Sequence, residues 1–146
     1  MHFFDEAMDL VPADDQFQVK KMQYASPGFI RVAVHRPIAG LISRGVELVA
    51  DRSSAANQEY TALGSYIRTN GLNNLKQDSE DWGKYDNELS TRTKRLLDAL
   101  GVDNSVRLLS LVDRPFEAAK IARAIFVRLD ILAGYQNADQ IRLPRR

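Results

Sequence analysis

The 146-residue sequence contains no cysteine, two histidines and a single tryptophan. Without cysteine, the chain can form neither a disulfide nor a zinc or iron–sulfur site built on thiolate ligands. The two histidines, His2 and His35, leave little scope for histidine-based catalysis or metal binding. The sequence also lacks the GxSxG, P-loop, GxGxxG and HExxH motifs. We therefore expect a protein that is not an enzyme and that holds no cofactor and no metal.

Long hydrophobic runs are missing as well. The most apolar stretch, residues 37–50, is 14 residues long and includes Arg44 and Glu47, whereas a helix needs about 20 apolar residues to cross a bilayer. The first 15 residues carry five acidic side chains and no lysine or arginine, unlike a secretory signal, which begins with a basic segment. The sequence thus predicts a cytoplasmic protein that does not bind a membrane.

The chain has almost no excess charge, because 20 Lys and Arg face 19 Asp and Glu. These charges are unevenly distributed, however. Residues 1–16 form an acidic arm, and the rest of the chain carries more basic than acidic side chains. With 45% hydrophobic and 27% charged residues, the composition is that of a globular domain. We expect a single domain over residues 1–146, with the arm docked on a basic surface of its own chain or of a neighbour.

Two short segments near the N-terminus, residues 17–24 and 29–34, are rich in β-branched and aromatic residues. Pro27 and Gly28 between them suit a tight turn, so we expect a β-hairpin over residues 17–34, with a bulge near Lys20. Two strands alone are marginally stable and expose two edges. The apolar side chains of the hairpin are therefore candidate partner contacts: Phe17, Val19, Met22, Tyr24, Phe29, Ile30 and Val32.

Residues 37–134 have the apolar spacing of a helical bundle. Apolar or small residues recur at heptad-like steps over residues 37–69, which predicts one long helix ended by Asn70–Gly71. A second helix is expected from Leu75 or Ser79 to Leu100. The loop between the two helices is short, which favours an antiparallel pair.

Two more helices are expected towards the C-terminus. The first is short, over residues 104–112, with Asp103 as its N-cap. The second, over residues 115–133, is apolar almost all round, which predicts a helix buried on several sides; residues 135–146 form a basic tail. The predicted fold class is mainly α: an N-terminal β-hairpin, a long antiparallel helix pair, and a short helix leading into a buried C-terminal helix.

Two functions are compatible with this organisation. The favoured one is a protein–protein interaction or assembly module, either a homo-oligomer or bound to another protein, which uses the hairpin and the long helical stripe. The alternative is a nucleic-acid-binding regulator with a helix-turn-helix-like segment over residues 92–112. Its phosphate and base contacts would be Arg92, Lys94, Arg95 and Arg107. Five of the nine residues at 104–112 are large and apolar, which weighs against that alternative.

Overall fold

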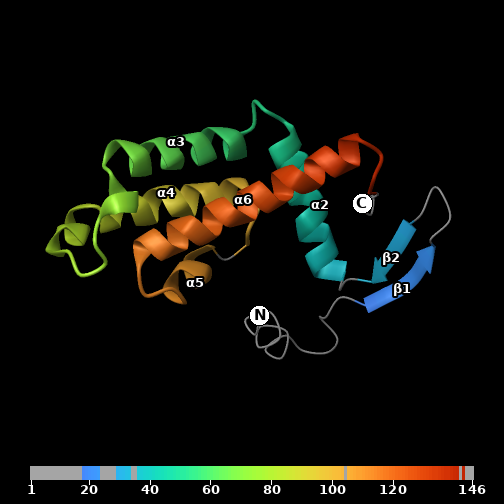
Figure 1. Cartoon of the computed structure of the whole chain (residues 1–146), viewed down its shortest axis with the longest axis horizontal. Coiled ribbons are helices and arrows are strands. Elements are labelled where there is room, and N and C mark those ends of the chain that lie inside the picture. Colours follow the sequence, from blue (N-terminus) through green and yellow to red (C-terminus); the bar gives the residue numbers. More distant parts are fainter. Residues whose placement is uncertain (1–17, 24–28, 34–35, 104, 142, 144–146) are drawn as a thin grey trace. The chain divides into compact units, whose positions relative to one another are not determined.

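The computed structural model describes residues 18–23, 29–33, 36–103, 105–141 and 143 (Figure 1). Side chains are described from residue 39 onward, with the same gaps and without that of Leu108. The chain divides into two compact units, Met1–Gly40 with Arg146, and Leu41–Arg145. The second unit contains all of the described core.

The first unit contains two strands, β1 (Gln18–Gln23) and β2 (Phe29–Ala33), which pair antiparallel. Val19 lies opposite Val32, and the register shifts between Val19 and Lys21. The helix α2 (Arg36–Ala50) begins in this unit and continues into the second.

The second unit is a helical bundle. After α2 come α3 (Ala55–Thr69), α4 (Asp86–Ala99), the short α5 (Ser105–Ser110) and the long α6 (Pro115–Asn137). Two 3₁₀ turns, Leu72–Asn74 and Glu80–Lys84, connect α3 to α4. Helix α4 is central, since it packs against α3, α5 and α6, and its buried residues are Leu89, Thr93, Leu96 and Leu97.

The fold class predicted from the sequence is corrected first at its N-terminal hairpin. Among the described residues of Leu41–Arg145 there are helices and turns but no β-strand. The compact unit that holds the core is therefore helical, and a hairpin is no part of its architecture. The alternation of residues 17–34 indicates local extended structure, but it carries no information on whether those residues join the core.

The predicted long first helix is wrong, because a turn at residues 51–54 separates α2 from α3. Ser54 is extended and its hydroxyl accepts a hydrogen bond from the backbone N–H of Asn57 at 3.3 Å, as an N-cap does. The Asn57 side chain donates to the carbonyls of Val49 and Asp51, both at 2.9 Å. These bonds satisfy the end of one helix and the start of the next. The heptad-like spacing continues across the turn and conceals it.

Three other predicted helix ends are confirmed, but the second helix begins at Asp86 and not at Leu75 or Ser79, because 3₁₀ turns occupy residues 72–74 and 80–84. Helix α3 ends at Thr69, and α6 begins at Pro115. After α4, Gly101 adopts a left-handed φ of +73°. Its N–H donates to the carbonyl of Asp98, and the next N–H, that of Val102, donates to the carbonyl of Leu97, both at 3.0 Å. This pair of bonds is a Schellman motif, which favours glycine.

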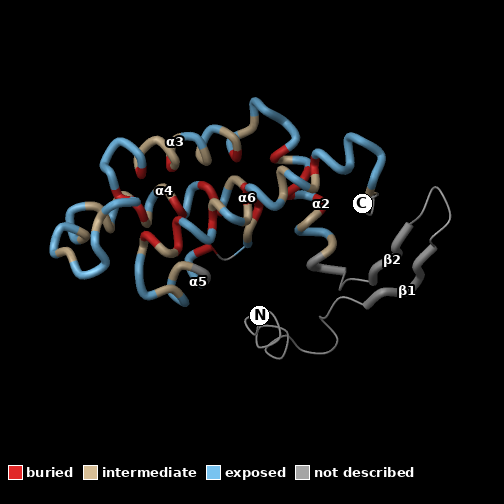
Figure 2. The backbone as a smooth tube through the Cα atoms, in the orientation of Figure 1, coloured by how far each residue is buried: buried red, intermediate tan, exposed pale blue. Residues whose placement is uncertain are grey.

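Helix α6 corrects the prediction of a buried C-terminal helix. It continues through Gly134 to Asn137, and Figure 2 shows buried and exposed residues interleaved along it. Its buried residues are Phe116, Ala118, Ala119, Ala122, Phe126 and Ala133. Four large apolar residues are exposed instead: Ile121, Val127, Ile131 and Tyr135. The helix thus has one face in the core and one apolar face on the surface.

No helix in the described part of the chain is both long and apolar enough to span a membrane.

Candidate functional site

The exposed apolar residues of α6 form one continuous row, which we call the α6 strip: Ile121, Ala124, Val127, Ile131 and Tyr135. Because successive residues of an α-helix are rotated by about 100°, these five lie within a sector of about 120°. Its four large side chains are 41–48% exposed. The row extends over about 21 Å of helix, at 1.5 Å per residue. It is therefore an apolar row along one helix face, with the exposed Arg128 in the same sector.

The core fixes the direction in which the α6 strip faces. On the opposite side of the helix, Phe126 stacks on Tyr60 of α3, with ring centroids 4.0 Å apart and planes 9° from parallel. Leu129 of α6 meets Gly45 of α2 so closely that an added Cβ would lie 2.8 Å from its Cδ1. Since buried contacts hold this side against α2 and α3, the strip is presented to solvent by a rigid helix.

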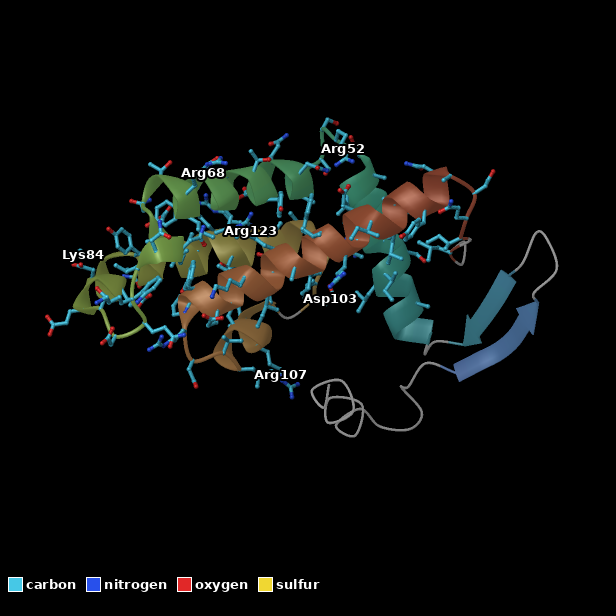
Figure 3. The ribbon with its side chains drawn as sticks, in the orientation of Figure 1. Arg52, Arg68, Lys84, Asp103, Arg107 and Arg123 are labelled. Atoms are coloured by element: carbon cyan, nitrogen blue, oxygen red, sulfur yellow. The ribbon has the colours of Figure 1, made fainter. Side chains whose placement is uncertain are left out.

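A groove flanks the strip between α3 and α6. Its volume is about 330 Å³, and it is lined by Tyr60, Arg123, Ala124, Val127 and Arg128. The guanidinium of Arg123 lies over the Tyr60 ring, 5.3 Å from its centroid, and Figure 3 shows this residue between the two helices. This stacking is a cation–π contact, and it holds the arginine at the wall of the groove.

Neither arginine of the groove is neutralised by a described carboxylate. The ion pairs of the described chain include neither Arg123 nor Arg128. The Nε atom of Arg123 is buried without a hydrogen-bond partner among the described residues. By contrast, Lys120 pairs with Glu117 at 3.0 Å on the same helix. The groove therefore combines apolar surface with two uncompensated positive charges.

The structure does not test the partner contacts that were predicted in the hairpin. Phe17 and Tyr24 lie outside the described residues. Val19, Met22, Phe29, Ile30 and Val32 lie in β1 and β2, where the backbone alone is described.

Of the predicted nucleic-acid contacts, Arg92 faces α3. Its Nε atom is 2.7 Å from a carboxylate oxygen of Glu88, and its guanidinium lies over the ring of Tyr66, 4.9 Å from the centroid. Burial raises the pKa of the Tyr66 hydroxyl above its ordinary value, and the charge of Glu88 adds to this rise. Arg92 therefore serves the packing of α3 on α4.

Lys94 faces α5 instead and pairs with Asp98 at 2.6 Å. Asp98 also accepts a hydrogen bond from the hydroxyl of Ser105, the first residue of α5, at 2.5 Å. Hydrogen bonds from Lys94 and then Ser105 lower the pKa of the Asp98 carboxyl. Arg95 and Arg107 are exposed and form no ion pair within the described chain. Because two of the four cations are paired and face different helices, the structure does not gather them into one basic surface.

A second cavity, of about 540 Å³, lies at the start of α6. Trp82 and Phe116 line it, with ring centroids 4.9 Å apart. Carboxylates also line it: Asp78, Asp86, Asp113 and Glu117. Within the described part of the chain, however, no group of three or more such side chains is placed to hold a metal ion. We assign no site there.

Comparisons with models of protein families, with curated proteins and with solved structures find no match to this chain. The candidate site therefore rests on its own geometry. Sequence reasoning missed the α6 strip because it assigned every apolar residue of this helix to the core. One signal was available: Arg128 interrupts the apolar heptad steps that run from Ile121 to Tyr135, and a charged residue in that position is expected at a surface.

Proposed function

We propose that this protein is a non-enzymatic protein–protein interaction module that binds its partner through the α6 strip. The observation that carries the proposal is the row of half-exposed apolar side chains along one helix face. Single exposed apolar residues are ordinary on protein surfaces, whereas contiguous apolar patches mark interaction sites. A straight apolar strip with residues at steps of three and four is the form in which helices recognise one another.

The rigidity of α6 supports the same function. The helix is anchored on one side by the stacked rings of Tyr60 and Phe126, and its Asp130 pairs at 3.0 Å with Arg52 in the turn that follows α2. A binding face that is already ordered loses little conformational entropy when a partner docks. The partner can therefore bind the strip without rearrangement of the bundle.

Site-specific photo-cross-linking in the cells that make the protein tests this function. A benzophenone amino acid at Ile131, in the centre of the strip, is expected to give a discrete covalent adduct with the bound protein. The matched control carries the same photo-reactive group at Thr61, an exposed residue of α3 outside the strip. We expect the Ile131 adduct to disappear when Val127→Asp, which places a charge in the strip, is added.

Equal labelling at the two positions would contradict the proposal, because the strip would then attract no more protein than an ordinary surface does. An Ile131 adduct that persists in full with Val127→Asp would contradict it too. The mass of the adduct distinguishes a second copy of this chain from another protein.

A further inference from the structure

We propose that the partner of the α6 strip is an acidic amphipathic helix of another protein, with carboxylates that bind Arg123 and Arg128. This inference rests on the proposed function and specifies the chemistry of the partner. It starts from the charge of the groove. Two guanidiniums line the groove, and neither pairs with a described carboxylate.

Arg123 is prepared for an anionic ligand. Its position is fixed by the Tyr60 ring, because the guanidinium lies 5.3 Å from the ring centroid. No hydrogen bond from its guanidinium to a described residue is present, although its Nε is buried. A guanidinium offers five N–H donors and binds a carboxylate through two of them. An Asp or Glu side chain that enters the groove would satisfy these donors.

Arg128 disfavours a second copy of this chain as the occupant. It lies at the midpoint between Ile121 and Tyr135, the two ends of the strip. If two strips packed in register about a twofold axis, parallel or antiparallel, each Arg128 would meet its own counterpart. Like charges brought together at the centre of an interface are destabilising. A partner with a carboxylate at that point has the opposite, favourable interaction.

The length and shape of the strip define the rest of the partner. About 21 Å of helix corresponds to four turns, or about 14 residues of a partner helix. Apolar residues at every third or fourth position of the partner would cover Ile121, Val127 and Ile131. Acidic residues along the edge that faces α3 would meet Arg123, and an acidic residue at the middle of the partner helix would meet Arg128. This combination is an amphipathic acidic helix, which binds in the helix-in-groove mode.

Fluorescence anisotropy with two synthetic peptides tests the inference on the full chain. Both peptides are helices of about 18 residues with the same leucine face; one is flanked by glutamates and the other by lysines. We expect the glutamate peptide to bind at least about tenfold more tightly at low salt. Arg128→Glu is expected to weaken binding of this peptide about tenfold and to strengthen binding of the lysine peptide. The control, Arg95→Glu, changes the same charge on an exposed part of α4 and should change either affinity less than about twofold.

Several outcomes would contradict the inference that the partner is an acidic helix. They are equal affinity for the two peptides, binding of neither peptide, or binding of the glutamate peptide that Arg128→Glu leaves unchanged. Duplex DNA that binds through Arg128 while the glutamate peptide does not would also overturn it. In each of these cases an Ile131 cross-link to another protein would leave the interaction function standing. An Ile131 adduct with the mass of two copies of this chain would likewise reject the acidic partner and retain the function.

Discussion

At the scale of single residues, Thr93 places a polar hydroxyl in the apolar core. It lies on the buried face of α4 with no exposed surface, and its Oγ1 has no hydrogen-bond partner among the described residues. A threonine in a helix can donate to the carbonyl four residues earlier, as Thr91 does to Asn87 at 2.9 Å. A buried hydroxyl that makes no such bond costs about 1–3 kcal/mol in desolvation.

Thr93→Val is therefore expected to raise the free energy of unfolding by about 1 kcal/mol, since valine has nearly the same shape and no hydroxyl. Urea denaturation followed by circular dichroism measures the change. The control is Thr91→Val, which removes an exposed hydroxyl that is hydrogen-bonded, and it should give no gain. A loss of stability in Thr93→Val would mean that this hydroxyl has a partner in solution.

At the scale of helices, α2 approaches α6 closely at Gly45. Gly45 of α2 lets Leu129 approach so far that an added Cβ would overlap its Cδ1, at 2.8 Å. Gly134, near the end of α6, has no atom of a described residue within 4 Å of the same hypothetical Cβ. Both glycines lie within helices. At Gly45 a neighbouring helix occupies the space that a side chain would take, whereas at Gly134 that space is open.

Alanine at these two glycines is expected to change the stability by different amounts. Gly134→Ala should raise the free energy of unfolding by about 0.5–1 kcal/mol, because alanine has the higher helix propensity. Gly45→Ala should not share this gain, because the Cδ atoms of Leu129 must shift to make room for the added Cβ. Thermal and urea unfolding of both variants measure the difference. Equal stabilisation by the two substitutions would mean that Leu129 is not packed against α2.

Helix ends could be predicted from the sequence where one residue type decides them. Gly101 and Pro115 are such positions, because a left-handed turn favours glycine and the first turn of a helix accepts proline. The break at residues 51–54 was not predictable from hydrophobic spacing, because the apolar steps on its two sides are in phase. Its signal is polar: Ser54 and Asn57 carry the capping bonds, and such bonds compete with helix continuation.

At the scale of the whole molecule, the sequence could not reveal which side of α6 is covered. A helix with apolar residues around its circumference has no intrinsic inner face, so the choice depends on where α2, α3 and α4 pack. In the structure they cover the side of Phe126 and leave Val127 41% exposed, although the two residues are adjacent. The candidate site was therefore invisible until the packing of the other helices was known.

This division of α6 predicts very different costs for adjacent substitutions. Phe126→Ala removes a ring stacked on Tyr60 and leaves a cavity, so it should lower the free energy of unfolding by about 3–5 kcal/mol. Val127→Gln should change it by less than about 0.5 kcal/mol, as surface substitutions do. Urea denaturation measures the free energy of unfolding of both variants. A loss for Val127→Gln as large as that for Phe126→Ala would show that the α6 strip is covered within the protein itself.

Because α6 holds its core face and its strip on one continuous helix, changes in its length would affect both together. A one-residue insertion between Phe126 and Ile131 would rotate everything beyond it by about 100° relative to the preceding turns. Ile131 and Tyr135 would then leave the line of the strip, and Ala133 would leave the core. An insertion of seven residues would misalign the two faces by only about 20°. Insertions or deletions in this helix that keep both the bundle and its binding face are therefore restricted to lengths close to a whole number of turns, such as about 7, 11 or 18 residues.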